Sequence, residues 1–541
     1  MKQKEGNIVD IVNGRIFKGR IFFNERIVSI EESSDIEGTE YIIPGLIDAH
    51  VHIESSMLTP LEYSKVALKN GVVAAVTDPH EIANVCGIEG VRFMIANAKA
   101  SPMKLFFGAP SCVPATAFET SGASLSGSEI NELFENKECT HLSEMMNYPG
   151  VIHNNDEVMG KIAIAKKHGK IIDGHAPLLT GHDLRRYVGA GISTDHECTS
   201  VLEALEKISL GMKIMLRNSS ASKDFDRLIS LIKTHPDEVM LCTDDCHPDE
   251  LEQGYINLLV KKALDKGYDL IDILRSATKT AKDLYELPVG LLQVNDAADF
   301  LVISNISEFR IKSTFINGVE VYSKEEGLSF SSTNESVINQ FYTNQLDSNS
   351  LQVRRTGSLL KVIQIIENSL LTESLNIKLD DYVETISTNI QEDILKIVVV
   401  NRYKKAKPAV GFIKGFNLKR GAIAGTIAHD SHNIVAVGVS DSEILSAIER
   451  IQQTQGGLIV VDNENSELLP LPIAGLMSDL DCHQVATRYK ELSAMANAMG
   501  STLHAPFMTL AFMSLLVIPE LKIGDQGLFD VNTFQFVALQ E

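Results

Sequence analysis

The sequence has few of the features that mark secreted, membrane-embedded or zinc-ribbon proteins. Its seven cysteines are scattered and form no Cys-X-X-Cys pair, which argues against a disulfide framework and against a zinc ribbon. The longest apolar stretch, 507–519, contains Thr509 and Ser514 and is too short to span a bilayer. The N-terminal segment MKQKEGNIVDIV lacks the apolar core of a signal peptide. We therefore expect a cytoplasmic protein with reduced cysteines.

Positive charge is also scarce. Lys and Arg number 49 against 71 Asp and Glu, which gives a formal charge of -22. Such a charge repels phosphate backbones and anionic lipid surfaces, so we expect neither a nucleic acid nor a membrane as partner. Hydrophobic residues make up 44% and charged residues 22% of the 541 residues. This is globular composition, and the length predicts two or three domains.

Two separated segments have the pattern of short strands. Residues 8–43 and 294–322 alternate β-branched and aromatic residues with turn signals such as Asn-Gly. We expect these two pieces to complete one sheet in a small domain, with boundaries at 1–43 and 288–330.

Between these pieces, apolar runs alternate with segments of helical periodicity. Eight such runs in about 240 residues match the size of a (β/α)8 barrel of the TIM type, which we place at 44–287 in an α/β protein. The runs are 42–50, 72–78, 104–111, 141–145, 170–176, 192–196, 213–217 and 239–245.

The remainder of the chain predicts a further domain. Residues 331–350 are polar and rich in Ser and Asn, which is typical of a linker. Residues 351–541 mix strand-like and helical runs, so we expect an additional α/β or α+β domain there.

Residues that can bind metals close five of the eight runs. Barrel enzymes carry their chemistry at the carboxyl ends of the strands. With 15 histidines in 541 residues, about 0.4 His-X-His triplets arise by chance, so one such pair is a weak signal. The ordered set across five runs favours a metal site over unrelated core histidines. This set is His50 and His52 in run one, Glu144 in run four, His175 in run five, His196 in run six, and Asp244 with Asp245 in run eight.

The residue types also suggest roles. Imidazole nitrogen and carboxylate oxygen are ligands for Zn, Mn and Fe ions. Residues two apart on a strand point the same way, so His50 and His52 face one side together. A carboxylate on the opposite wall can bridge two ions, and a second one can hold an ion and accept a proton from water. Glu144 and Asp244 suit these two roles.

The segment PGLIDAHVH, at 44–52, resembles the first-strand signature of the amidohydrolase superfamily. HVHIESSMLTP, TDPHEIANVCG, AHDSHN and LPLPIAGLMSD are similar to signatures of the bacterial adenine deaminases within that superfamily. The resemblance covers essentially the whole chain, and it implies that the two strand-rich pieces, 1–43 and 288–330, form a small β-sandwich domain beside the barrel. Many superfamily members bridge their metals with a carboxylated lysine on the fourth strand, and Glu144 in its place weighs against a dihydroorotase or hydantoinase.

The resemblance implies hydrolytic deamination of adenine to hypoxanthine and ammonia in purine metabolism. It implies two divalent ions, Mn²⁺ or Fe²⁺ with Zn²⁺ as a further candidate, and a homodimer. One ion is expected on His50, His52 and Asp244, the other on His175 and His196, with Glu144 between them. Asp244 is expected to take a proton from water and pass one to the departing amine.

The segment Asp78-Pro79-His80-Glu81 follows run two and is the nearest source of contacts to a purine ring. We expect Glu81 or His80 to contact the purine at N1, with Asp78 orienting them; a turn fixed by Pro79 is the alternative. The later segment AHDSHN contains His429 and His432. Its place is expected on a loop, with either a role near the substrate or a role in an interface.

Other functions stay open at this point. The nearest alternative is another cyclic amidohydrolase or aminohydrolase of the same superfamily, and a more distant one is a catalytically silent metal-binding barrel. Deaminases of the tRNA and cytidine type are excluded, because they need a Pro-Cys-X-X-Cys segment that this sequence lacks.

Overall fold

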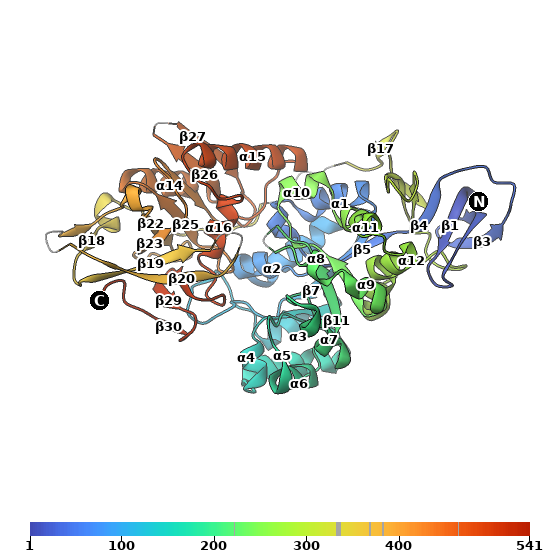
Figure 1. Cartoon of the computed structure of the whole chain (residues 1–541), viewed down its shortest axis with the longest axis horizontal. Helices are drawn as coiled ribbons and strands as arrows, with labels where there is room; N and C mark the ends of the chain where they lie inside the picture. The colour runs from blue at the N-terminus through green and yellow to red at the C-terminus, as the bar shows by residue number, and fades with distance from the viewer. Residues whose placement is uncertain (221, 332–336, 367–368, 381–383, 464) are drawn as a thin grey trace. The chain divides into compact units, whose positions relative to one another are not determined.

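A computed structural model describes residues 1–220, 222–331, 337–366, 369–380, 384–463 and 465–541 (Figure 1). The chain forms two compact units. Unit 1 contains 1–80, 92–111 and 126–335, and unit 2 contains 81–91, 112–125 and 336–541. Part of the expected linker at 331–350, namely 332–336, lies outside the described residues. The domain boundaries drawn from the sequence stay a prediction.

The two strand-rich segments of unit 1 join in one eight-stranded sheet. Strand β4 from the first segment pairs antiparallel with β14 from the second, with Phe300 opposite Pro44. The sheet order is β17-β16-β15-β14-β4-β1-β2-β3. The strands are β1 (Lys2–Asp10), β2 (Arg15–Phe23), β3 (Ile27–Glu32), β4 (Tyr41–Pro44), β14 (Phe300–Ile303), β15 (Ile311–Ile316), β16 (Val319–Ser323) and β17 (Gly327–Leu328).

Aromatic packing shows that this sheet folds over itself. Strands β2 and β15 are four positions apart in the order, which would separate them by about 19 Å in a flat sheet. Yet the rings of Phe23 on β2 and Phe315 on β15 lie 5.8 Å apart, and Phe300 stacks on Phe315 at 4.4 Å. The two halves of the sheet therefore face each other across an apolar core, as in a sandwich.

Each of the eight predicted runs contains a strand, which confirms the predicted α/β class. The first seven barrel strands are β5 (Leu46–His52), β6 (Val72–Thr77), β7 (Lys104–Ala109), β8 (His141–Met145), β9 (Ile172–Gly174), β10 (Thr194–Asp195) and β11 (Lys213–Arg217). The eighth position is shared by β12 (Val239–Cys242) and β13 (Asp244–Asp245).

These strands form a closed parallel ring. Strand β13 pairs with β5, and the ladder runs from there through β6, β7 and β8 to β9. A second ladder joins β10, β11 and β12. Between β9 and β10, Ser193 N donates to Ile172 O at 2.9 Å and Gly174 N donates to Thr194 Oγ1 at 3.2 Å. These bonds bridge the two ladders and complete the ring.

Gly45 marks the point where the chain leaves the flanking sheet and enters the barrel. Run one therefore contains the end of β4 and the beginning of β5 rather than a single strand. A Cβ at position 45 would lie 2.4 Å from Val73 Cγ2, so a side chain there would collide with the neighbouring strand β6. Close backbone approach explains the glycine.

Two helices of unit 1 begin at polar capping residues. Thr59 caps α1 by accepting a hydrogen bond from Glu62 N, and Ser200 caps α7 through Glu203 N. The helices are α1 (Pro60–Lys69), α2 (His80–Ala98), α3 (Gly127–Glu135), α4 (Tyr148–Ile152), α5 (Asp156–Lys167), α6 (Gly181–Gly189), α7 (Val201–Ser209), α8 (Phe225–Leu228), α9 (Ser230–Thr234), α10 (Pro248–Gln253), α11 (Ile256–Asp265), α12 (Leu270–Leu274) and α13 (Thr280–Tyr285), with turns η1 (Ile53–Ser56) and η2 (Arg275–Lys279). Residues 81–91 of α2 belong to unit 2.

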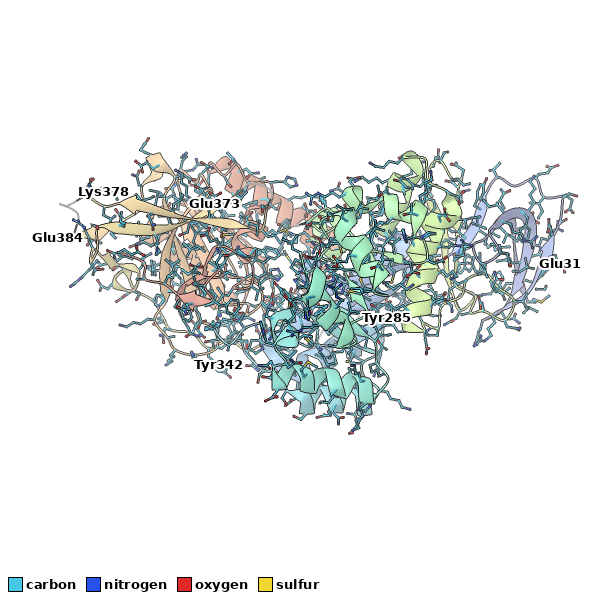
Figure 2. All side chains as sticks on the ribbon, turned by 60° about the horizontal axis from the view of Figure 1, so that its bottom comes forward. Glu31, Tyr285, Tyr342, Glu373, Lys378 and Glu384 are labelled. Carbon is cyan, nitrogen blue, oxygen red and sulfur yellow. The ribbon has the colours of Figure 1, made fainter. Side chains whose placement is uncertain are left out.

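Unit 2 is built on a largely antiparallel eight-stranded sheet. Its order is β20-β19-β23-β22-β25-β24-β26-β27, and Figure 2 labels Glu373 and Lys378 on the edge strand β20. The strands are β19 (Leu359–Ile365), β20 (Thr372–Lys378), β22 (Leu395–Val400), β23 (Ala409–Lys414), β24 (Ala422–Gly425), β25 (Ile434–Gly438), β26 (Gly457–Asp462) and β27 (Asn465–Pro470). With its helices, this antiparallel order makes unit 2 an α+β fold.

Helix α14 covers one face of this sheet. Its residues Ile444, Ile448 and Ile451 pack with Val398 and Ile459 in one buried cluster.

No helix in the described part of the chain is long and apolar enough to cross a membrane. The remaining elements of unit 2 are α14 (Asp441–Thr454), α15 (Cys482–Ala498), α16 (Pro506–Phe512), β18 (Val353–Arg354), β21 (Thr385–Ile386), β28 (Leu521–Gly524), β29 (Gly527–Asp530), β30 (Gln535–Phe536), η3 (Ser348–Leu351) and η4 (Ile390–Glu392).

Lys522 on β28 is a fully buried lysine. Its Nζ donates to Leu370 O at 2.8 Å and to Phe512 O at 3.2 Å. Burial lowers the pKa of Lys522 to about 7. Between pH 7 and the ordinary pKa of 10.5, the unfolded chain holds a proton that the folded chain lacks, so raising the pH stabilises the fold.

We expect Lys522→Met to remove this pH dependence. One proton of difference between the folded and unfolded chain changes the free energy of unfolding by roughly 1.4 kcal/mol per pH unit. Between pH 7 and pH 9.5, the free energy of unfolding of the wild type should therefore rise by about 2–3 kcal/mol relative to that of the variant. Urea titrations of both proteins at the two pH values measure this gain. Lys405→Met changes an exposed lysine and should keep the pH dependence of the wild type. The assignment would be contradicted if the wild type gained the same stability relative to both variants.

Candidate metal centre

The six predicted metal ligands meet at one end of the barrel in unit 1. Each lies at or just beyond the carboxyl end of a strand: His50 and His52 on β5, Glu144 on β8, His175 after β9, His196 after β10 and Asp244 on β13. All are buried except His175, whose side chain is 22% exposed.

Two imidazoles and a carboxylate form the first half of the cluster. His50 Nε2 lies 3.1 Å from His52 Nε2, and His52 Nε2 lies 3.2 Å from Asp244 Oδ1. The His50 Nε2 to Asp244 Oδ1 distance is 3.8 Å. As expected from their spacing, His50 and His52 point to the same side of β5.

Glu144 joins this half to the second one. Its Oε1 lies 3.4 Å from His52 Nε2. Its Oε2 lies 2.9 Å from His175 Nδ1 and 3.1 Å from His196 Nε2. One carboxylate therefore faces imidazoles of both halves with a different oxygen for each, which is the arrangement that a bridging ligand needs.

The donor atoms fit a divalent metal ion. Bonds from a first-row ion to nitrogen or oxygen are about 2.0–2.2 Å long, so ligand atoms around one ion lie within about 4.4 Å of each other. The groups His50, His196, Asp244 and Glu144, His175, His196 each bring their ligand atoms within 4.8 Å of one another. The distances of 2.9–3.8 Å given above are in the same range.

The charges of the cluster are strongly coupled. Burial alone would raise the pKa of Glu144, but His175 and His196 outweigh it and hold that pKa well below its ordinary value. Burial would lower the pKa of His175, but Glu197 and Glu144 raise it to about 9. The carboxylates therefore favour positive charge at the site.

Asp78 and His80 lie beside the same cluster. His80 Nδ1 is 3.2 Å from Asp78 Oδ2 and 3.6 Å from Glu144 Oε1. Asp78 Oδ1 also accepts the His80 backbone N–H at 3.1 Å. Asp78 thus fixes the orientation of His80, and these two with His52 and Glu144 form another group whose ligand atoms lie within 4.8 Å.

Glu81 has a different environment, within unit 2. Its Oε1 lies 3.0 Å from His429 Nδ1 and its Oε2 lies 2.6 Å from His432 Nε2. His429 and His432 belong to the loop between β24 and β25, so the expectation of a loop for AHDSHN is confirmed. Neighbouring residues in the sequence, His80 and Glu81, therefore have separate sets of partners.

Arg217 is a site residue that the sequence reasoning missed. It closes β11, and its Nη1 donates to Asp244 Oδ2 at 2.9 Å. The same guanidinium contacts Glu197 and donates to Asp224 Oδ2 at 3.0 Å. It contacts three carboxylates and leaves Asp244 Oδ1 facing the histidines. The sequence did contain one signal for Arg217, because it is a basic residue at the end of a run whereas other runs end in acidic residues.

Buried hydrogen bonds hold the strands that carry the ligands. Asp48 Oδ2 accepts from Tyr255 OH at 2.6 Å, and Asp48 Oδ1 accepts from Thr243 N at 3.1 Å, which ties β5 to the residue before Asp244. Asp195 accepts from Ala176 N at 2.8 Å, beside His175. Below the site, Tyr285 OH (labelled in Figure 2) donates to Asp173 Oδ1 at 2.6 Å.

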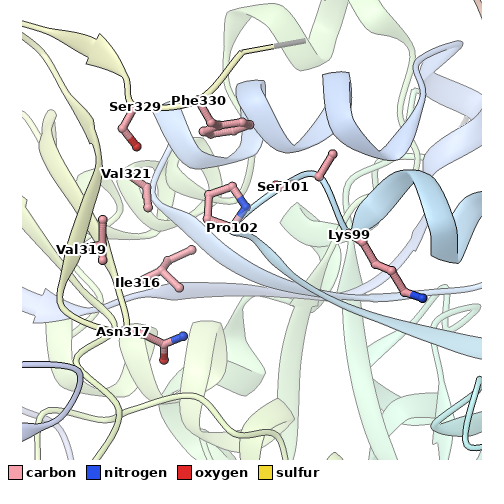
Figure 3. Close-up of a pocket in the computed structure, with 10 residues that line it drawn as sticks. Lys99, Ser101, Pro102, Ile316, Asn317, Val319, Val321, Ser329 and Phe330 are labelled. Carbon is pink, nitrogen blue, oxygen red and sulfur yellow. The ribbon is translucent and has the colours of Figure 1, made fainter. Parts of the chain in front are cut away.

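A hollow of about 410 Å³ in unit 1 lies away from these residues (Figure 3). Lys99, Ser101 and Pro102 line it where the chain enters β7, together with Ile316 and Phe330 of the flanking domain. Because 99–102 precede β7, this hollow is at the amino ends of the barrel strands. The candidate ligands occupy the carboxyl ends, so the hollow is not part of the metal centre.

Two family models match the chain. The model described as the amidohydrolase family matches residues 41–321, and the model described as the adenine deaminase C-terminal domain matches residues 369–535. The first of these ranges contains the whole barrel with its six candidate ligands, and the second contains the loop of His429 and His432.

Relatives of known name match over the full length. An adenine deaminase from Methanosarcina mazei is 47% identical over 555 residues, covering 100% of this chain and 99% of that protein. An adenine deaminase from Parabacteroides distasonis is 45% identical, covering 99% of this chain and 98% of that protein. The chain belongs to the amidohydrolase family, and within it to the adenine deaminases.

One solved structure similar to this chain is a beta-aspartyl dipeptidase from Fervidobacterium islandicum. It shares 16% identity with a TM-score of 0.48, covering 61% of this chain and 100% of that one.

We expect metal binding to release protons and to strengthen as the pH rises. Glu197 and Glu144 raise the pKa of His175 to about 9 against the opposing effect of burial, and a histidine must lose its proton before it can ligate an ion. Affinity for Mn²⁺ should therefore increase from pH 6.5 to about pH 9. Calorimetric titrations in buffers with different ionisation heats count the released protons.

Two histidine variants sharpen this test. His175→Ala should lower both the affinity and the number of protons released, whereas His182→Ala, on an exposed position of α6, should change neither. Equal Mn²⁺ affinity at pH 6.5 and 8.5 in the wild type would contradict the assignment.

We expect Arg217→Met to weaken metal binding about 10- to 100-fold, the usual effect of losing a residue that orients a ligand. The variant leaves Glu197, Asp224 and Asp244 without their shared cation and frees Asp244 Oδ2. Arg227→Met is the matched control, because Arg227 contacts Asp224 at 3.0 Å from a 65% exposed position. Competition with a fluorescent chelator measures both variants, and similar losses would argue against a specific role for Arg217.

Proposed function

We propose that this chain hydrolyses adenine to hypoxanthine and ammonia, as a cytoplasmic enzyme of purine salvage or catabolism. The observation that carries the proposal is the set of six candidate ligands gathered at one barrel mouth, in a chain 44–47% identical to proteins named adenine deaminase over nearly its whole length. Glu144 at the bridging position distinguishes this site from one built on a carboxylated lysine.

The donor set supports two divalent ions. His50, His52 and Asp244 would hold one, His175 and His196 the other, and Glu144 would contact both. Mn²⁺ and Fe²⁺ are proposed, with Zn²⁺ as a further candidate, because all three accept imidazole and carboxylate ligands. Such cations lower the pKa of water and stabilise negative charge that develops during attack.

Asp244 is proposed to move the proton of the attacking water. Water adds its oxygen to C6 of adenine and gives one proton to Asp244. The C6–N bond then breaks, and the amine leaves as ammonia with that proton. Burial would raise the pKa of Asp244, but His52, His196 and Arg217 outweigh it and hold that pKa well below its ordinary value, so Asp244 is in the ionised form that a general base requires.

The Asp78-Pro79-His80-Glu81 segment is proposed to contact the purine. A hydrogen-bond donor at N1 would stabilise the charge that develops on the ring when C6 is attacked. His80 is oriented by Asp78 beside the ligand cluster. Glu81 is proposed as a further purine contact because its segment, TDPHEIANVCG, resembles a signature of the adenine deaminases.

Ammonia release from adenine by the Mn²⁺-loaded protein tests the proposal. We expect turnover of adenine and none of hydantoin or dihydroorotate, which separates an adenine deaminase from a cyclic amidohydrolase. Glu144→Ala should lose metal and activity together, whereas Glu135→Ala, on an exposed position of α3, should lose neither. Metal-loaded protein that releases no ammonia from adenine would support the silent barrel, and full activity in a metal-free sample would overturn the metal assignment.

Glu81→Gln provides a separate test of the purine contact. The amide keeps the size of the side chain and removes its charge, so kcat/KM for adenine should fall about 100-fold or more, the usual range for a lost acid–base group. An unchanged kcat/KM would remove Glu81 from this role. We further propose a homodimer, which sedimentation of the purified protein tests.

A further inference from the structure

The carboxylate of Glu81 is held by two imidazoles from one loop of unit 2. His429 Nδ1 faces Oε1 at 3.0 Å, and His432 Nε2 faces Oε2 at 2.6 Å. All three residues are buried, with exposed fractions of 8% or less. Because each oxygen has its own nitrogen partner, the carboxylate can neither rotate nor tilt without losing a contact.

The loop that supplies these imidazoles is itself fixed on several sides. The ring of His429 stacks on Phe512 at 4.5 Å. Asn433 Nδ2 donates to Thr120 O at 3.0 Å, and Asn433 Oδ1 accepts from Arg402 N at 3.1 Å. Tyr403 OH donates to Ser431 O at 2.6 Å. A loop held this firmly can set the position of another side chain.

Charge agrees with this geometry. Burial would raise the pKa of Glu81, but the charges and hydrogen bonds of His429 and His432 outweigh it and hold the pKa well below its ordinary value. Burial lowers the pKa of His432, and this effect is larger than the opposing one of the Glu81 carboxylate, which raises it. Glu81 is therefore ionised, and one imidazole nitrogen faces each of its oxygens.

We propose that His429 and His432 are positioning residues for the deamination, which act by orienting the Glu81 carboxylate toward the purine. The inference rests on the proposed function and deepens it, because it assigns a task in the reaction to the His-Asp-Ser-His-Asn segment of the C-terminal domain. The competing explanation is that the two histidines merely satisfy a buried carboxylate during packing.

Amide substitutions separate the two explanations. An Asn amide reaches about as far as Nδ1 of histidine, and a Gln amide about as far as Nε2. His429→Asn and His432→Gln therefore keep a donor in place, whereas His429→Gln and His432→Asn keep a donor at the wrong reach. We expect the matched pair to retain most of kcat and the mismatched pair to lose about 10- to 100-fold, the usual effect of a misplaced group.

A double-mutant cycle shows whether the effect passes through Glu81. The four variants are made in the wild type and in Glu81→Gln, and kcat and KM for adenine, metal content and melting temperature are measured for each. If the histidines act through Glu81, the mismatched variants should lower kcat less than about twofold further in the Glu81→Gln background. His504→Ala, on an exposed position of unit 2, is the control.

Each outcome decides the inference. The inference is supported if the mismatched variants lose kcat and the matched ones retain it, with metal content unchanged. This loss must also disappear in the Glu81→Gln background. Equal losses in both backgrounds, or losses that follow melting temperature rather than amide reach, overturn it in favour of packing. A metal-loaded wild type that releases no ammonia from adenine overturns the proposed function and this inference together.

Discussion

The contact of one carboxylate, Glu144, with imidazoles on both sides is the interaction on which the barrel site depends. Strands β5 and β8 are three positions apart, which would separate them by about 14 Å in a flat sheet. The 3.4 Å between His52 Nε2 and Glu144 Oε1 exists because the parallel strands curl into a closed ring. Closure in turn depends on β13 pairing with β5, which places Asp244 beside Val51 and Asp245 beside His52. The fold and the site therefore depend on the same ring closure, because the ring that buries the core also brings the ligands together.

Burying this much charge requires a second set of polar residues behind the ligands. An unpaired ion in a protein interior is strongly unfavourable unless it is neutralised and hydrogen-bonded. Arg217 meets that need for Asp244, and Lys207 does so for Asp195 at 2.9 Å, next to His196. Asp48 has a different solution, since burial raises its pKa to about 7 while Thr243 and Tyr255 donate to it. These residues leave the inward-facing atoms of the ligands available for a cation.

The sequence was informative wherever the signal was local and periodic. Apolar runs predicted the barrel strands, because a buried parallel strand is itself a short apolar segment. His50 and His52 were predicted to share a side because strand geometry alone dictates it. Arg217 was missed because two of its three carboxylate partners, Glu197 and Asp244, lie 20 and 27 residues away in the sequence. Contacts between distant segments leave no periodic signal.

The Asp-Pro-His-Glu segment shows the same limit in a sharper form. Read as a sequence, its polar residues form one candidate group near a purine. In the structure, Asp78 fixes His80 beside Glu144, while Glu81 is held by His429 and His432. Successive residues at the start of a helix point about 100° apart, so neighbours in sequence face different surroundings. A buried carboxylate at position 81 would be poorly tolerated without donors, and the loop of unit 2 provides them. The charge state of Glu81 is thus set by residues that only the fold of unit 2 brings near it.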